Sequence, residues 1–285
     1  MKRTILYRGS LSSCNYGCTY CPFAKRRNSR AELEVDAAGL RRFVAWIGEQ
    51  TGSRHQLLFT PWGEALIRDY YRKAVIALSR MPQVVRVAVQ TNLSFPIKTL
   101  CGADPRRLAL WATYHPGETD RASFLAQCDR MEDLGIPYSV GMVGLHAYLD
   151  EIEEMRAALP AHRYLWVNAY KREPNYYTEE MVARLSAVDP YFPINNRRHT
   201  SEGRACRAGH TSFTVDEKGE VRRCHFIPAV VGNIGDGDIA EKLVKSPCTN
   251  ASCGCYIGYI HLNHLNLESV YGDGLVARIP RSWAV

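Results

Sequence analysis

Short apolar runs alternate with amphipathic stretches over the first two thirds of this 285-residue chain, and this alternation limits its fold more than any other feature. Each run is bounded by polar, glycine or proline residues, which is typical of a buried strand. The predicted strands cover residues 4–7, 56–59, 84–89, 108–113, 138–143 and 164–169. The stretches between them have helical periodicity, and the predicted helices cover residues 31–50, 67–80, 121–134, 145–159 and 178–188.

Strands joined by crossover helices run parallel, because tight turns would pair them antiparallel. We therefore predict an α/β fold, an open and curved partial (β/α)6 barrel with helices on one face. The spacing alone leaves a flat doubly wound sheet as the alternative.

The composition changes near residues 189–203, which contain Pro190, Pro193 and Gly203. We place a domain boundary there, between a core domain of residues 1–195 and a small cysteine-rich C-terminal extension of residues 196–285. The extension contains a hairpin-like segment around Gly219. It is too small for a robust core of its own, so a metal cross-link would stabilise it.

The chain contains ten cysteines, but it has neither a secretory signal nor an apolar run long enough to span a membrane. We therefore expect a cytoplasmic protein whose cysteines bind metal or act in catalysis. They fall into an N-terminal group (Cys14, Cys18 and Cys21) and a C-terminal group (Cys206, Cys224, Cys248, Cys253 and Cys255). Cys101 and Cys128 stand apart and are expected to be buried small hydrophobes, with hydrogen-atom donation as the alternative.

The net charge of +7 comes largely from short basic runs at residues 25–27, 41–42, 106–107, 197–198 and 222–223. These runs are scattered and carry few aromatic residues between them, so we interpret them as a solvated surface. Attraction of nucleic acid or of an acidic electron-donor protein is the alternative.

A CxxxCxxC motif, formed by Cys14, Cys18 and Cys21, directly follows the first predicted strand. Closely spaced thiolates can converge on one iron–sulfur cluster, and three of them leave one iron of a four-iron cluster without a protein ligand. An open metal position is what allows a site to engage a cofactor or substrate. A structural zinc site, the alternative, needs a fourth ligand, and the nearest histidine is His55.

This loop resembles the CxxxCxΦC signature of radical S-adenosylmethionine (AdoMet) enzymes, in which Φ is aromatic and is Tyr20 here. The resemblance implies that the three cysteines hold a [4Fe-4S] cluster whose fourth iron binds the amino and carboxylate groups of AdoMet. It also implies reductive cleavage of AdoMet to a deoxyadenosyl radical, which abstracts hydrogen from the substrate.

Two later strand ends are also similar to motifs of this family. The string Pro61-Trp62-Gly63-Glu64 resembles the GGE motif, which contacts the methionine amino group, although Trp62 replaces its first glycine. An ordinary turn at a helix start is the alternative for this string. Thr91 and Asn92 resemble a segment that lines the cofactor pocket.

Gly141 lies in a strand that resembles the one packed against adenine in the family. In β/α barrels the C-terminal strand ends carry the chemistry, which makes His115, Asn168, Tyr170 and Lys171 candidates for catalysis or substrate contact. Ordinary loop or helix-start roles are the alternative for each of them.

The C-terminal cysteines include a CX12GX4C string from Cys206 through Gly219 to Cys224. It resembles the first half of a twitch or SPASM extension, which implies an auxiliary [4Fe-4S] cluster. The implied ligands are Cys206, Cys224, Cys253 and one of Cys248 or Cys255, with Cys255 less favoured because a Cys-Gly-Cys pair is cramped. Structural zinc is the alternative.

An auxiliary cluster held entirely by protein would exchange one electron with a substrate radical, which favours a net oxidation. Because the sequence starts at its first strand, without a leader-binding module, we expect a small metabolite or a peptide held by the core as substrate. A flavodoxin or ferredoxin is the expected electron donor. The alternatives are a RiPP-type peptide maturase, an RNA-modifying radical enzyme and a non-catalytic metal-binding protein.

Overall fold

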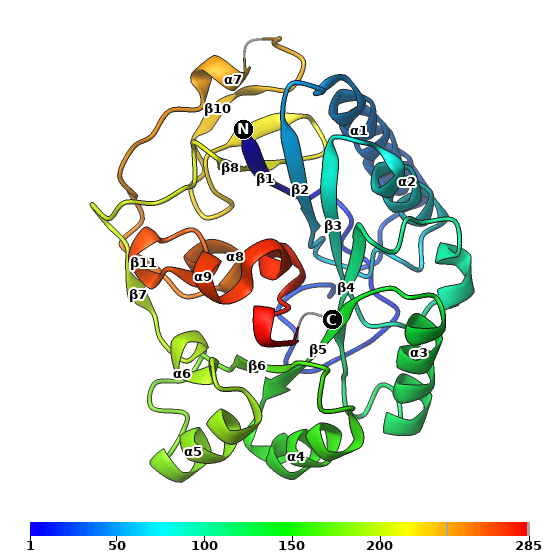
Figure 1. Ribbon diagram of the computed structural model, residues 1–285, viewed down its shortest axis with the longest axis vertical. Coiled ribbons are helices and arrows are strands. Elements are labelled where there is room, and N and C mark those ends of the chain that lie inside the picture. The colour runs from blue at the N-terminus through cyan, green and yellow to red at the C-terminus, as the bar shows by residue number, and fades with distance from the viewer. Residues whose placement is uncertain (238, 284–285) are drawn as a thin grey trace.

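The computed structural model describes residues 1–237 and 239–283, and a parallel sheet forms its centre (Figure 1). Its core strands are β1 (Lys2–Tyr7), β2 (Arg54–Phe59), β3 (Val84–Thr91), β4 (Leu108–Thr113), β5 (Tyr138–Gly144) and β6 (Leu165–Ala169). Each strand pairs in parallel with the next one along the chain. This sequential order is that of an open barrel rather than of a doubly wound sheet, where the order reverses. The predicted partial barrel is therefore confirmed.

Helices cover the outer, convex face of this sheet (Figure 1). They are α1 (Arg30–Glu49), α2 (Asp69–Arg80), α3 (Arg121–Asp133), α4 (Leu149–Ala158) and α5 (Glu179–Val188). Polar caps fix where three of them begin: Ser29 with a full capping box to Glu32, Asp120, and Thr178. The predicted helix bounds agree to within two residues except for α4, whose first turn is the separate 3₁₀ helix His146–Tyr148.

The C-terminal part extends the same sheet instead of forming one of its own. Strand β8 (Ser212–Val215) pairs in parallel with β1, and β9 (Glu220–Arg222) and β10 (Val230–Asn233) follow it antiparallel. Gly219 has a φ of +81°, a left-handed conformation that glycine adopts without strain, and it closes the β8–β9 hairpin as predicted. Within the described residues, the sheet order is β10-β9-β8-β1-β2-β3-β4-β5-β6.

Short elements make up the rest of the C-terminal part. They are α6 (Phe192–Asn195), β7 (His199–Thr200), α7 (Ile239–Lys242), β11 (Ser252–Cys253), α8 (Tyr256–Tyr259), α9 (Leu267–Tyr271) and the 3₁₀ helices Asn263–Leu265, Gly272–Ala277 and Arg281–Trp283. Strand β11 pairs with β7. Helices α8 and α9 lie on the concave side of the sheet, opposite α1 and α2 (Figure 1).

Both faces of the core strands are buried, and alternate residues belong to different apolar clusters. Ile5 and Leu57 face the outer helices, whereas Leu6 and Leu58 pack with the C-terminal segment on the concave side. This explains why the strands are continuous apolar runs rather than alternating ones.

The centre of the concave side holds a fully buried arginine, Arg278. Its guanidinium lies over the rings of Trp166, Tyr256 and Trp111, at 4.0, 4.4 and 5.8 Å from their centroids. Such contacts stabilise a cation that is removed from water. The C-terminal segment therefore fills the barrel interior at the N-terminal ends of the strands, where Ser139 also donates to the carbonyl of Ala277.

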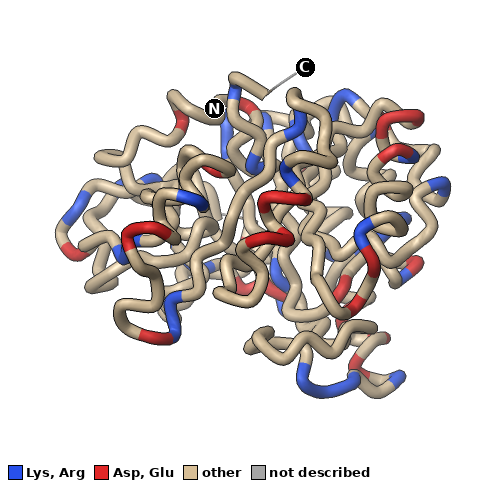
Figure 2. Tube along the Cα trace, turned by 90° about the horizontal axis from the view of Figure 1, so that it is seen from below, with Lys and Arg blue, Asp and Glu red and all other residues tan. Residues whose placement is uncertain are grey.

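Basic and acidic residues interleave along the surface (Figure 2). Several arginines of the basic runs form ion pairs, among them Arg26 with Glu32 and Arg222 with Asp216. Among the described residues, none of the helices has the length and apolar content needed to cross a lipid bilayer.

Candidate active site

A cavity of about 360 Å³ opens at the C-terminal ends of β1 to β4. It is lined by residues from the loop after each strand, including Arg8, Cys14, Cys18, Cys21, Trp62, Gly63, Glu64, Thr91, Asn92 and His115. The carboxyl ends of parallel strands meet at one edge of the sheet, so residues that are distant in sequence come together there. All three N-terminal cysteines share this cavity with Gly63, Glu64, Thr91 and Asn92.

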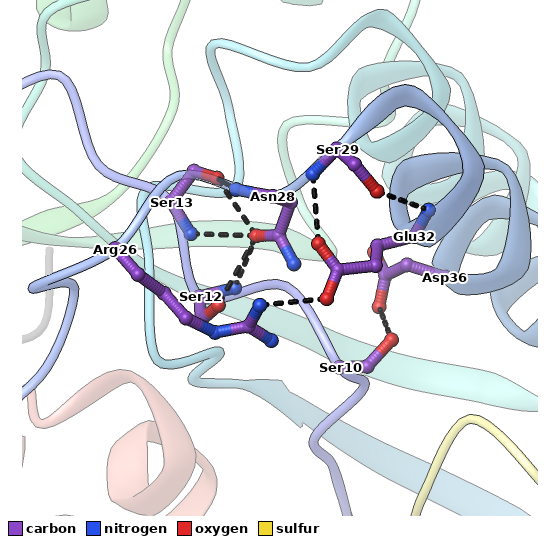
Figure 3. Close-up of polar contacts among 8 residues, drawn as sticks. All are labelled: Ser10, Ser12, Ser13, Arg26, Asn28, Ser29, Glu32 and Asp36. Atoms are coloured by element: carbon purple, nitrogen blue, oxygen red, sulfur yellow. Dashed lines mark hydrogen bonds and ion pairs between the residues drawn. The ribbon is translucent and has the colours of Figure 1, made fainter.

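The loop that carries the three cysteines is tied at its base by one side chain, that of Asn28 (Figure 3). Its Oδ1 atom accepts hydrogen bonds from the backbone N–H groups of Ser12 and Ser13, both at 2.8 Å, and from the Ser13 hydroxyl at 2.7 Å. The backbone N–H of Asn28 donates to the same hydroxyl at 2.5 Å. These bonds hold the two ends of the loop side by side.

A buried carboxylate also holds the segment that leads into this loop. Asp36 on α1 accepts from the Leu11 N–H at 3.0 Å and from the Tyr70 hydroxyl at 2.9 Å. Burial raises the pKa of Asp36, against the effect of these hydrogen bonds. The chain segment entering the loop is therefore fixed to both α1 and α2.

The cysteine sulfurs already have polar neighbours. Cys14 Sγ accepts from the Tyr16 N–H at 3.4 Å and lies 3.8 Å from Asn92 Nδ2. Burial raises the pKa of Cys14 and raises that of Cys18 to about 11. A bound metal would reverse this, because a coordinating thiol is deprotonated.

The spacing of these thiols bears on which metal group they fit. In the described part of the chain, no three His, Cys, Asp or Glu side chains lie close enough to share a single metal ion. Each thiolate of an iron–sulfur cluster binds a different iron. The three cysteines that line this cavity supply the thiolate donors that such a cluster uses.

Glu64 is buried at the wall of the cavity and is held by three hydrogen bonds. Its carboxylate accepts from the Thr91 hydroxyl at 2.8 Å and from the N–H groups of Asn92 and Leu66 at 2.7 and 3.0 Å. Burial raises the pKa of Glu64. A carboxylate has about four acceptor positions, so one remains for a ligand in the cavity.

Gly63 is required by the cysteine loop itself. A Cβ atom at this position would lie 1.9 Å from the carbonyl oxygen of Ser13, and the Glu64 N–H donates to that same oxygen at 3.0 Å. Only glycine permits this approach. The Gly63-Glu64 pair therefore docks directly onto the residue before Cys14.

His115 lines the cavity, whereas the predicted cofactor contact Tyr20 is not one of its lining residues and instead contacts His115. His115 Nδ1 is 2.8 Å from the Tyr20 hydroxyl and 3.4 Å from Cys18 Sγ. Burial lowers the pKa of His115 to about 4, so the ring is neutral at pH 7. His115 thus lines the cavity as expected, in contact with the cysteine loop.

Other predicted site residues lie elsewhere. Gly141 does not line this cavity, because a Cβ there would meet the Trp166 ring at 2.0 Å. Tyr170 and Lys171 line a separate cavity beyond β6, and Lys171 Nζ donates to the carbonyls of Asn195 and Gly254. Asn168 is an exposed residue of β6.

The prediction that the isolated cysteines are both buried is confirmed for Cys128 and wrong for Cys101. Cys128 is buried on α3, but Cys101 is exposed, because it ends the 3₁₀ helix Ile97–Leu100 in a surface turn.

The four other C-terminal thiols all lie within electrostatic range of Cys253. Burial, followed by the thiolates of Cys224, Cys255, Cys206 and Cys248, raises the pKa of Cys253 to about 12. Burial, then Cys206 and Cys248, raises that of Cys224 to about 11. Cys206 and Cys253 are buried, while Cys224 and Cys248 are half-buried.

Cys255 differs from the other four. It is exposed, and its charge acts on Arg8 and Lys171, the cations at the ends of β1 and β6. Its charge also acts on Cys253, so Cys255 lies within electrostatic range of both that thiol and these two cations.

An aromatic and basic wall of the cavity was not expected from the sequence. Arg8 stacks on Trp62 at 4.3 Å, and the Trp62 ring lies 4.5 Å from Phe23 and 5.4 Å from His225. The one available signal was Trp62 itself, the departure from the glycine motif.

No family model matches the chain, and no curated protein sequence matches it. Solved structures do resemble it. Native anSMEcpe with bound AdoMet and the Cp18Cys peptide gives a TM-score of 0.56 at 14% identity, over 86% of this chain and 81% of that chain. Native anSMEcpe with bound AdoMet gives 0.56 at 15% identity, over 85% and 81%.

A third similar structure is Streptococcus suis SuiB bound to precursor peptide SuiA. Its TM-score is 0.51 at 12% identity, and the match covers 85% of this chain and 62% of SuiB. Both anSMEcpe and SuiB are radical AdoMet enzymes. The chain therefore has the fold of the radical S-adenosylmethionine enzymes.

Proposed function

We propose that this protein is a radical AdoMet enzyme that removes hydrogen from a small molecule or a peptide. The observation that carries the proposal is that Cys14, Cys18 and Cys21 line one cavity with Glu64 and Asn92 at the C-terminal edge of the sheet. The similar structures support the fold. The thiols and the carboxylate that line the cavity support the proposed radical chemistry.

The residues of the cavity have separable roles in this proposal. Cys14, Cys18 and Cys21 would hold a [4Fe-4S] cluster, which together with AdoMet supplies the deoxyadenosyl radical when both are bound. Glu64 offers its remaining acceptor position to an ammonium group, and its three internal hydrogen bonds fix the carboxylate in advance. Asn92 positions Cys14 from the opposite wall.

Cys206, Cys224, Cys248 and Cys253 are the ligands that we propose for an auxiliary [4Fe-4S] cluster of twitch type. Their mutual electrostatic range supports this set, and we leave Cys255 out of it because Cys255 is exposed whereas these four are buried or half-buried. A cluster held at all four corners by protein supplies one-electron transfer, which makes a net oxidation the reaction class that we propose. If this site held zinc, which has no redox chemistry, the argument for a net oxidation would no longer apply, although the fold would be the same.

The proposed partners are a substrate and a low-potential electron donor such as flavodoxin or ferredoxin. The peptide complexes of anSMEcpe and SuiB support a peptide among the possible substrates. An RNA substrate gains no support from the surface, because arginines of the basic runs are paired with carboxylates.

The experiment is anaerobic reconstitution followed by reduction with dithionite in the presence of AdoMet. We expect about eight irons per chain, with matching sulfide, and formation of deoxyadenosine. Replacing the loop thiol in Cys14→Ala should abolish deoxyadenosine and lower the iron content by about half, because a two-thiolate loop holds a cluster poorly. Cys101→Ala, at an exposed turn away from the cavity, is the matched control and should behave as wild type.

Wild-type protein that holds its full iron but forms no deoxyadenosine would instead be a non-catalytic metal protein. Zinc at the C-terminal site, with iron only at the first, would keep the radical chemistry and remove the proposed net oxidation.

A further inference from the structure

Arg8 directly follows β1 and forms the partition between two cavities. One is the cysteine-lined cavity, and the other, of about 620 Å³, is lined by Arg8, Trp62, Thr214, Asp216, His225 and Phe226 among others. The side chain is fixed in place: Nε donates to the Thr60 carbonyl at 2.6 Å, and Nη2 donates to the Thr60 hydroxyl at 3.0 Å. Nη1 lies 2.6 Å from His225 Nε2, and the guanidinium stacks on Trp62.

Among the residues that the structure describes, this arginine has no carboxylate partner. Across residues 1–237 and 239–283, no Asp or Glu forms an ion pair with Arg8, whereas Arg222 beside it pairs with both Asp216 and Glu220. Burial lowers the pKa of Arg8 to about 10, so the side chain is still charged at neutral pH. The direct hydrogen-bond partners of Arg8 are neutral, and the charge that acts on it is that of the Cys255 thiolate. A buried cation without a carboxylate partner is costly, and an anion that arrives beside it gains the corresponding attraction.

The hydrogen bonds leave Arg8 with donors to spare. A guanidinium has five N–H donors, and three of them are used by Thr60 and His225. One donor therefore remains on each terminal nitrogen. Two donors in one plane match the two oxygens of a carboxylate or a phosphate.

We propose that Arg8 binds a carboxylate or phosphate group of the substrate at this partition. The inference rests on the proposed function, in which the cysteine-lined cavity receives the substrate, and it narrows the substrate to an anionic molecule or an acidic peptide. It also gives Trp62 a role. A glycine at this position could not stack under Arg8, and the stacking fixes the plane in which the remaining donors lie.

The test uses reconstituted protein with saturating AdoMet, so that the cofactor occupies its own site. Inorganic phosphate and acetate serve as probes, and their apparent Kd values are taken from the rise in Tm with probe concentration. We expect Arg8→Gln to raise both Kd values at least tenfold. Arg8→Lys should give an intermediate loss, because it keeps the charge but not the planar pair of donors.

Arg30→Gln is the matched control, since Arg30 is on the surface of α1 with its side chain 94% exposed and paired with Glu34. It should bind both probes as wild type does. If Arg8→Gln does not fold, Arg8→Lys decides the question, and an unchanged Kd for either variant overturns the inference.

A further arm compares AdoMet with decarboxylated AdoMet. If Arg8→Gln weakens binding of AdoMet but not of the decarboxylated form, the anion at Arg8 is the carboxylate of the cofactor, and the substrate assignment is overturned. Deoxyadenosine formation by wild type separates the two proposals: its absence, with probe binding still dependent on Arg8, rejects the radical chemistry and keeps the anion site.

Discussion

A single amide oxygen organises the loop that carries Cys14, Cys18 and Cys21. Asn28 Oδ1 accepts from Ser12 and Ser13 at the start of the loop, although Asn28 itself lies at its end (Figure 3). The sequence gives little hint of this role, because asparagine is common in loops and its partners lie 15 and 16 residues away.

We predict that Asn28→Ala loses most of the iron at the N-terminal site and the spectral change on adding AdoMet. Removing the acceptor leaves several loop donors unsatisfied, at a cost of about 1–3 kcal/mol for each one that stays buried. Asn28→Asp keeps an acceptor in the same place and should retain most of the iron. The measurements are iron content and electron paramagnetic resonance with and without AdoMet.

Ser29→Ala is the control for this prediction, since Ser29 caps α1 next to the loop without bonding Ser12 or Ser13. It should lower helix stability by about 1 kcal/mol and leave the iron in place. Equal iron loss in the alanine and aspartate variants of Asn28 would show that the amide oxygen does not position the loop.

The cysteines, Glu64, Thr91 and Asn92 were predictable as one site, because each follows a strand and parallel strands end at the same edge. Gly63, predicted as a cofactor contact, lines the cavity, and a Cβ atom on it would meet the carbonyl of Ser13. Gly141 likewise makes room for Trp166. A glycine at such a position indicates that another group approaches the backbone closely, but the sequence does not identify that group.

At the scale of elements, the C-terminal hairpin continues the barrel sheet through the β1–β8 pairing. His261, in the segment after α8, connects to this strand: its Nε2 lies 3.1 Å from the Ser212 hydroxyl of β8. Its ring is buried, which lowers the pKa of His261 to about 3.

This buried histidine predicts a pH dependence of stability. In the unfolded chain a histidine titrates near 6.5, so between pH 6.5 and about 3 the unfolded state binds a proton that the folded state does not. The contribution of neutral His261 is therefore fully present above about pH 6.5 and is lost as the pH falls. His261→Gln should reduce the slope of unfolding free energy against pH by up to about 1.4 kcal/mol per pH unit.

Urea unfolding at pH 7.5, 6 and 5 measures this slope, and His162→Gln, at an exposed position, is the control that should keep the wild-type slope. A wild-type slope in the His261 variant would mean that other groups cause the acid sensitivity.

At the scale of the whole molecule, the C-terminal segment supplies most of the apolar cluster on the concave side of the sheet. Trp111, Tyr164 and Trp166 on the concave side of the sheet belong to one apolar cluster with Tyr256 and Leu275. The core strands therefore carry two buried faces, of which only the outer one is covered by helices of residues 1–195.

We predict that a chain truncated after Asn195 does not fold into a stable monomer. It would expose the concave face, including two tryptophans, and large apolar patches drive association. Size-exclusion chromatography and binding of an apolar dye are the measurements, with the full chain as control. A soluble truncated monomer with a cooperative melting transition would establish residues 1–195 as an independent domain.

The sequence by itself determined the strand and helix pattern, the parallel order and the grouping of the N-terminal cysteines with Glu64 and Asn92. Those features follow from local periodicity and from the geometry of β/α units, which act over a few residues to a few tens of residues. Only the tertiary structure decided that the C-terminal segment fills the barrel, that Cys255 is exposed while the other four C-terminal cysteines are not, and that Arg8 meets His225, 217 residues away. Contacts over such separations depend on how the whole chain packs, so they cannot be predicted from the local spacing of residues.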